Sequence, residues 1–195
     1  MKVIHAPNPL LRIQTKPVKK ITPGLYQITK DMIKLTKTFK DPEGVGLAST
    51  QVGLDGAFFV ALLQEKQSKV ASEAILRVKK SDRASTKRDK FITVFNPKIT
   101  WKGKAVKKYF EGCLSIPNYW GEVQRHLTIK VTYIDESGKE VNATLKGALA
   151  WIFQHEIDHL NGKLFPDRVL EQKGKFYKFT GKDKTGTDNF EEVTL

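Results

Sequence analysis

A pair of histidines with a glutamate between them carries the clearest chemical pattern in the sequence. His155 and His159 are four positions apart, so on a helix both imidazoles lie on one face and can reach one metal ion. Glu156 lies between them, placed to act on a water molecule rather than on the metal. Apolar residues at helical spacing and Gly162 as a helix stop predict a core-facing helix. The alternative is a core helix whose histidines hydrogen-bond to the backbone.

Two histidines leave a metal site incomplete, because zinc-like metals take three protein ligands and keep one position open for water. The usual third ligands lie downstream and are missing here. One class has a histidine where this chain has Phe165. Another class takes a glutamate from a following helix, but after Arg168 only Glu171 precedes a Lys- and Gly-rich tail. Cys113 is the only cysteine of the chain. A lone cysteine forms no internal disulfide and is otherwise a small buried apolar residue. We predict that it is the third ligand, with His155 and His159.

Three separated blocks of the sequence resemble the peptide deformylase family in wording, order and spacing. They read GVGLASTQ at 44–51, EGCLS at 111–115 and QHEIDH at 154–159. Two further segments, 7–12 and 164–168, also resemble that family, so the likeness covers most of residues 3–170. Ser49 stands where the family usually has a second alanine, a small change that we expect to be tolerated.

The resemblance implies hydrolysis of the formyl group from the N-terminal formylmethionine of nascent peptides, with release of formate. Glu156 would carry the proton of the attacking water to the leaving amine. The resemblance further implies that the Gln51 side chain and the Leu114 backbone N–H stabilise the oxyanion beside the metal. Gly44 and Gly46 could let the backbone approach a ligand closely, and the alternative for such a pair of glycines is an ordinary turn. The position of Gln51 after them favours the first interpretation, and we count Gly46 among the candidate catalytic residues.

The nature of the metal follows from the family rather than from the residues. The family uses Fe²⁺, and Zn²⁺, Ni²⁺ or Co²⁺ are often found after purification, whereas cysteine and histidine ligands suit both iron and zinc. The resemblance also implies an ion pair of Glu111 and Arg125 beneath the cysteine loop. Asp158 is a third candidate for a residue that supports the ligands from behind.

The helix that carries the histidines also predicts part of a substrate pocket. Trp151 and Ala148 lie four and seven residues before His155, so they share its face. The family commonly has an aliphatic residue at the position of Trp151, and the alternative here is ordinary core packing. We predict that the Trp151 indole forms one wall of a methionine pocket and that the small Ala148 leaves room for it. Val45 and Gly44 are further candidates for this pocket.

Composition limits the class of protein. The chain has 195 residues, of which 39% are hydrophobic, enough for one compact domain with a real core. No run of eighteen apolar residues and no signal-like segment occurs, so no membrane association is expected. A single cysteine fits a reducing compartment, and we expect a cytoplasmic protein. Oligomeric state is left open.

The net charge of +13 is spread unevenly. Residues 64–108 carry fourteen lysines and arginines against four acids, whereas residues 109–170, which hold all predicted metal ligands, carry six against eight. The most basic segment of the sequence therefore contains none of the predicted metal ligands. It is either a solvated coat or a surface attracted to a polyanion such as ribosomal RNA, and a ribosome near the nascent chain is a candidate partner.

Strand and helix patterns predict an α+β fold, mostly antiparallel strands around one central metal-binding helix. Thr22 and Pro23 mark a helix start, and apolar or alternating segments mark strands at 57–63, 91–95, 128–134 and 140–144. We expect one catalytic domain over 1–170, with a basic insertion at about 64–90. Residues 171–195 are expected to be extended or loosely packed, with a candidate edge strand at 191–195.

Two other functions use the same residues. A metalloendopeptidase could use the same helix, but its usual downstream ligand is missing. A basic ribosome- or RNA-binding protein could hold a structural metal, which would need four ligands; only His5 and His126 could complete the set.

Overall fold

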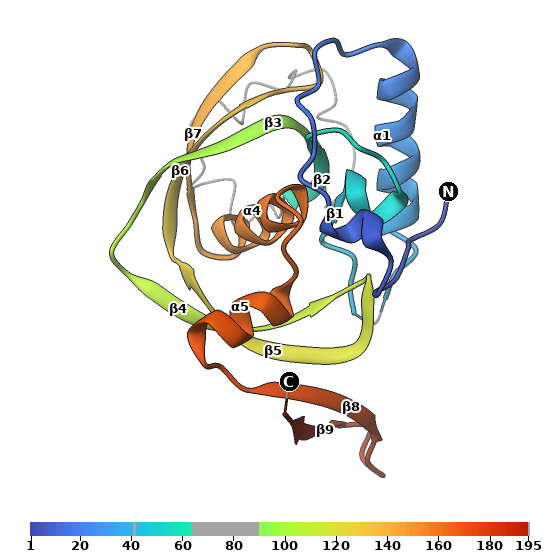
Figure 1. Cartoon of the computed structure of the whole chain (residues 1–195), viewed down its shortest axis with the longest axis vertical. Coiled ribbons are helices and arrows are strands. Elements are labelled where there is room, and N and C mark those ends of the chain that lie inside the picture. The colour runs from blue at the N-terminus through green and yellow to red at the C-terminus, as the bar shows by residue number, and fades with distance from the viewer. Residues whose placement is uncertain (41, 64–89, 195) are drawn as a thin grey trace.

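The computed structural model describes residues 1–40, 42–63 and 90–194. Helix α4 (Gly147–Leu160) lies at its centre, between two antiparallel sheets (Figure 1). The predicted α+β class is confirmed, and so are the antiparallel strands around the histidine-bearing helix. The basic insertion predicted at about 64–90 lies outside the described residues, except for Lys90. Within the described residues, no helix is both long and apolar enough to cross a membrane.

The larger sheet supplies most of the hydrophobic core. Its five strands follow the order β1-β2-β3-β6-β7, and their bounds are β1 Gly46–Ala48, β2 Phe58–Leu63, β3 Lys90–Lys102, β6 Thr128–Ile134 and β7 Glu140–Lys146. All six residues of β2 are buried, as a continuous apolar strand requires. β6 and β7 alternate buried and exposed positions and form the predicted hairpin. One face of this sheet packs on α4 through the pair Phe59 and Phe153.

The smaller sheet covers the other side of α4. Its four strands are β4 Val106–Cys113, β5 Ile116–His126, β8 Phe176–Lys182 and β9 Asp188–Val193, in the order β4-β5-β8-β9. β5 ends at His126 and β6 begins at Thr128, so the chain passes almost without a break from one sheet to the other. The two sheets therefore wrap around α4 (Figure 1).

Helix α4 is held in register by polar bonds as well as by its apolar side chains. The buried Gln154 amide accepts from the His126 backbone N–H and donates to the His126 carbonyl, at 3.1 and 2.9 Å. These bonds fix the helix against the junction of β5 and β6, one residue before His155. The helix stops before Gly162, whose φ of +68° favours glycine. A side chain at Gly162 would also overlap the backbone of Arg12.

Among the described residues, two further α-helices pack around this core, and two short 3-10 helices lie at Pro9–Arg12 and Ser49–Val52. α1 (Pro23–Thr36) begins at Pro23 as the sequence predicts, and the Thr22 hydroxyl caps it by accepting from the Leu25 N–H. α5 (Phe165–Gln172) follows α4 and packs against β5 through Phe165 and Val169.

The end of the chain is extended, as expected, but it is not loosely packed. The edge strand expected at 191–195 is present as β9, although it runs from Asp188 to Val193. β8 pairs with β5 and β9 pairs with β8, so the two strands extend the smaller sheet as a hairpin (Figure 1). Phe176 is buried against Phe165 of α5. The Gly- and Lys-rich composition hides this order, because the free edge of β5 supplies the hydrogen bonds that the hairpin's own sequence does not indicate.

Candidate metal and catalytic site

Three potential metal ligands meet at the centre of the molecule, as the sequence predicts they should. Cys113 ends β4, while His155 and His159 lie one turn apart on α4. Their ligand atoms all lie within 4.8 Å of one another, and Cys113 Sγ is 3.2 Å from His159 Nε2. Metal–sulfur and metal–nitrogen bonds of about 2.0–2.3 Å place neighbouring ligands roughly 3–4 Å apart, so the cluster has the size of a site for one ion.

A buried carboxylate sets the orientation of His155. Glu111 on β4 is fully buried, and its Oε2 lies 3.0 Å from His155 Nδ1. This contact leaves the Nε2 atom of His155 as the ligand atom that faces Cys113. Arg125 on β5 donates to both oxygens of Glu111, at 2.7 and 2.9 Å. The structure thus contains the Glu111–Arg125 pair that the resemblance implies.

Asp158 continues the same network from the next turn of α4. Arg125 Nη1 donates to Asp158 Oδ2 at 2.6 Å, and Arg168 on α5 donates to both oxygens of Asp158. Burial would raise the pKa of Asp158, but the bonds from Arg168 and Arg125 hold it below its usual value. The role of Arg168 was not predicted from the sequence, although Arg168 ends the segment 164–168 that resembles the family.

Electrostatics prepare the cluster to bind a cation. Burial alone would raise the pKa of the Cys113 thiol, but attraction to His159 and hydrogen bonds from both histidines lower it to about 5. The lowered pKa favours the thiolate form of Cys113, which is the form that binds metal. Burial would raise the pKa of Glu111, yet Arg125 and His155 lower it to about 2, so its charge persists.

Glu156 sits beside the ligands without joining them. Burial raises its pKa to about 7, against the opposing attraction of the two histidines. Its Oε2 is buried and has no hydrogen-bond partner among the residues that the structure describes. A side chain at Gly46 would overlap Glu156 Oε1, so glycine is needed there to leave room for the carboxylate. A carboxyl group with a pKa near neutrality is suited to accept and then donate a proton.

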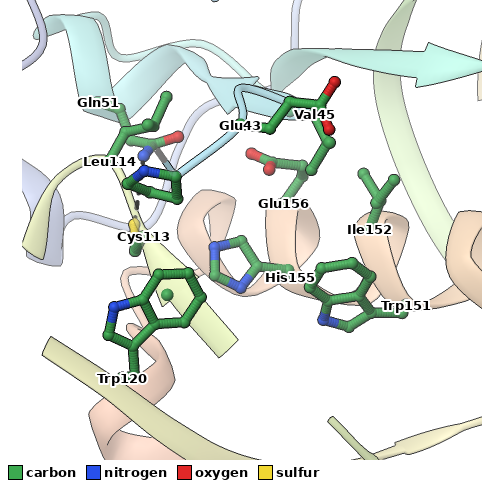
Figure 2. A pocket seen from close by; sticks show the side chains of 13 residues that line it. Glu43, Val45, Gln51, Cys113, Leu114, Trp120, Trp151, Ile152, His155 and Glu156 are labelled. Carbon is green, nitrogen blue, oxygen red and sulfur yellow. Dashed lines mark hydrogen bonds between the residues drawn. The ribbon is translucent and has the colours of Figure 1, made fainter. Parts of the chain in front are cut away.

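Gln51 reaches the cluster from the larger sheet. Its carbonyl oxygen accepts from the Ala48 backbone N–H at 2.8 Å, which turns its amide nitrogen toward Cys113 Sγ (3.4 Å) and Ser115 Oγ (3.2 Å). Leu114, in the turn between β4 and β5, lies beside Gln51 at the edge of the pocket (Figure 2). Gln51 and Leu114 therefore both line the pocket next to Cys113, and the resemblance implies that these two residues stabilise the oxyanion.

The cluster opens into a pocket of about 310 Å³. Trp151 and Trp120 stand on opposite sides of His155, and Ile152 and Val45 complete an apolar wall (Figure 2). The remaining lining residues are Pro42, Glu43, Gly46, Gln51, Gly112, Cys113, Leu114 and Glu156. A concave, mostly apolar space that ends in a few polar groups is the usual form of a small-ligand site.

Two residues predicted for the pocket do not line it. Gly44 is buried against α1, where a side chain would overlap the Thr36 carbonyl, so glycine there serves helix packing instead of ligand approach. Ala148 is also absent from the lining, since it lies a turn beyond Trp151 on α4, away from His155.

Trp120 is one of five pocket residues that the sequence analysis did not predict, together with Pro42, Glu43, Gly112 and Ile152. It pairs across the strands with Gly112, and a Cβ at Gly112 would come within 2.9 Å of its ring. Glycine at position 112 thus lets the indole lie next to Cys113. The paired strands around the cysteine could have indicated this, but only once their register is known.

The donor set fits a divalent metal. It combines one cysteine sulfur with two imidazoles. Glu156 Oε2, which has no hydrogen-bond partner among residues 1–40, 42–63 and 90–194, indicates a polar species in the same space. Three protein ligands with room for a fourth are typical of catalytic sites, whereas structural sites close all four positions. The fold and the site together define a metal-dependent hydrolase.

Comparisons with known proteins agree with this class. The family model for polypeptide deformylase matches residues 1–175. A peptide deformylase of Mesorhizobium japonicum is 34% identical over 186 residues, which is 93% of each chain. One of Buchnera aphidicola is 37% identical over 173 residues, or 89% of each chain. The crystal structure of peptide deformylase from Thermotoga maritima aligns with a TM-score of 0.67 at 34% identity, covering 86% of this chain and 95% of that one.

The chain belongs to the polypeptide deformylase family. It is a metal-dependent hydrolase that removes formyl groups from peptides. This result decides against the metalloendopeptidase and the RNA-binding module that the residues alone left open.

Proposed function

We propose that Cys113, His155 and His159 hold the catalytic metal of this deformylase and that Glu156 moves the proton. The observation that carries the proposal is the buried Glu156 Oε2, which has no hydrogen-bond partner in the described part of the chain and lies beside three converging ligands. When bound, a divalent metal acidifies water and polarises a carbonyl oxygen. Glu156 takes a proton from the water that adds to the formyl carbon and returns it to the amine nitrogen as the C–N bond breaks. Formate and a free N-terminus leave.

Gln51 and Leu114 are proposed to bind the oxygen that gains negative charge during this addition. The amide nitrogen of Gln51 already points toward Cys113, because the Ala48 N–H holds its carbonyl oxygen. A donor fixed before the reaction needs little reorganisation as charge develops, and that is how such groups lower a barrier. The Leu114 backbone N–H is assigned the second donor from its place beside Gln51.

The apolar wall of the pocket is proposed to bind the methionine side chain. Trp151, Ile152 and Val45 present apolar surface next to His155. An unbranched thioether can pass beside a flat indole and gains a sulfur–aromatic contact of roughly 0.3–1.5 kcal/mol. Gly46 contributes by leaving room for Glu156 and not by touching the side chain of the substrate.

The test of the assignment compares two variants of anaerobically purified protein. Glu156→Gln removes the proton carrier but no ligand, so we expect the metal to be retained while formate release from formyl-Met-Ala falls by about 10²–10⁴-fold. Cys113→Ala removes a ligand, so we expect loss of the metal itself. Metal content and formate release are measured on both. A Glu156→Gln protein that loses its metal and stays active would contradict the assignment.

We propose Fe²⁺ as the native metal, which the family implies and the donor set accommodates. Elemental analysis of protein purified without oxygen, with zinc, nickel and cobalt measured together, tests this. Iron at one equivalent with full activity supports it, and an active protein that holds only zinc contradicts it.

We also propose that the enzyme works in the cytoplasm close to the ribosome, guided by its basic charge. Residues 64–108 hold fourteen lysines and arginines against four acids, whereas the metal ligands follow at position 113 and beyond. Replacement of residues 64–89 by a short Gly/Ser bridge is expected to leave formyl-Met-Ala turnover near normal and to weaken salt-sensitive co-sedimentation with ribosomes. Loss of dipeptide turnover in a folded deletion variant would contradict this separation of roles.

A further inference from the structure

The indole of Trp151 does more than face the pocket. Its Nε1–H donates to Glu111 Oε1 at 2.8 Å, and its ring stacks on Tyr109 with centroids 5.2 Å apart and planes at 7°. Tyr109 and Glu111 are two positions apart on β4, so both point to the same face of that strand, toward α4. The stack and the hydrogen bond together hold the indole in one orientation.

Trp151 completes the set of donors around the carboxylate that orients His155. Glu111 Oε1 accepts from Arg125 Nε at 2.7 Å and from Trp151 at 2.8 Å, while Oε2 accepts from Arg125 Nη2 at 2.9 Å and faces His155 Nδ1 at 3.0 Å. A carboxylate has about four acceptor positions, and each of these contacts uses one. Glu111 is completely buried, so no solvent replaces a lost donor easily.

We propose that Trp151 is a positioning residue for the metal centre, acting through Glu111 on His155. This inference rests on the proposed function, in which His155 is a ligand. Without the indole N–H, Oε1 keeps only the Arg125 donor, so the carboxylate is free to turn toward the arginine. Its Oε2 then moves relative to Nδ1 of His155, and the ligand atom on the far side of the ring moves with it.

The indole of Trp151 also lines the pocket. One side chain touches both the space for the substrate and the carboxylate behind a ligand. An aliphatic residue at position 151 would supply neither the aromatic wall nor the hydrogen bond, whereas another aromatic residue without an N–H would supply the wall alone. The two roles can therefore be separated by substitution.

Trp151→Phe keeps an aromatic wall and the stack on Tyr109 but removes the N–H, whereas Trp151→Leu removes both. The metal-free proteins are loaded with Co²⁺, and the visible absorption spectrum and the rate of Co²⁺ release are measured. We expect Trp151→Phe to shift the spectrum and to speed release about tenfold, within the 10–100-fold effects typical of residues behind a ligand. Its kcat is expected to fall while KM for formyl-Met-Ala stays close to normal, and Trp151→Leu is expected to raise KM as well.

Trp101→Phe is the matched control, because Trp101 is half exposed on β3 and its ring faces Lys130, away from the ligands. It should leave the Co²⁺ spectrum and release unchanged. A folded Trp151→Phe protein with the wild-type spectrum and release rate would overturn the inference. If instead Cys113→Ala binds Co²⁺ as the wild type does, the proposed ligand set fails, and this outcome is distinct from the first.

A measurement on the unmodified protein keeps the inference testable if the variants do not fold. In ¹H–¹⁵N spectra the Trp151 indole N–H should exchange slowly with solvent and shift when Zn²⁺ is added, whereas the Trp101 signal should do neither. An indole signal of Trp151 that exchanges as fast as that of Trp101 and ignores Zn²⁺ would overturn the proposal.

Discussion

Strands β4 and β5 turn one face toward helix α4 and the other outward, and the two faces differ in chemistry. The inner face carries buried charges and a ligand, namely Glu111, Cys113 and Arg125. The outer face carries stacked aromatic rings: Phe110 lies parallel to Trp120 at 5.4 Å and meets Tyr177 and Phe190 of the C-terminal hairpin edge-on. Because successive side chains alternate across a strand, one stretch of sequence supplies both faces.

The two faces depend on their parts in different ways. On the inner face each charge has lost its water, so it is stable only while its partners are present. On the outer face the aromatic contacts are apolar and partly exposed. Removal of one ring should therefore lower the free energy of unfolding in proportion to the apolar area that the ring covered. We therefore expect abrupt losses from single changes on the inner face and graded losses on the outer one.

Arg125→Met should produce the largest loss of stability. It removes the three hydrogen bonds of 2.6–2.9 Å that Arg125 donates to Glu111 and Asp158. A buried charge whose partner is removed typically costs about 3–5 kcal/mol of unfolding free energy. Urea denaturation of the metal-free proteins at neutral pH measures it.

The control for this change is an ion pair on the other face of the same two strands. Lys108 lies 2.8 Å from Glu122, but its side chain is 56% exposed. Lys108→Met should therefore cost less than about 1 kcal/mol. Similar losses for the two variants would contradict the contrast between the faces.

The contrast also marks what could be predicted from the sequence. The ligand pair follows from helix geometry alone, because His155 and His159 are four residues apart on α4 whatever surrounds them. The central helix and the β6–β7 hairpin follow from hydrophobic periodicity in the same local way. Cys113 is a weaker prediction from the residues alone, and the family resemblance strengthens it, since its distance in space from the helix depends on the whole fold.

Features that depend on strand register could not be predicted. The bond from Trp151 to Glu111 requires β4 to cross α4 at one position, and the place of Trp120 beside the pocket requires it to pair with Gly112. The Gly44 expectation failed for a related reason. Glycine serves any close approach, and only the structure shows that the neighbour is α1 and not a ligand.

Phe110→Ala tests the aromatic contacts of the outer face and should lower stability less than Arg125→Met does. The ring is 42% exposed, so part of its area is already in water, and we expect a loss of about 1–2 kcal/mol, below the usual cost for a buried phenylalanine. Its removal also takes away the surface on which Trp120 stacks, and Trp120 lines the pocket.

The kinetics of Phe110→Ala separate the faces further. Metal content and kcat should stay near normal, because Cys113 and Glu111 point the other way, while KM for formyl-Met-Ala should rise as Trp120 loses its fixed position. Steady-state kinetics and urea denaturation of the same preparation measure both effects. Loss of metal from this variant, or a stability loss as large as that of Arg125→Met, would show that the two faces are energetically one unit.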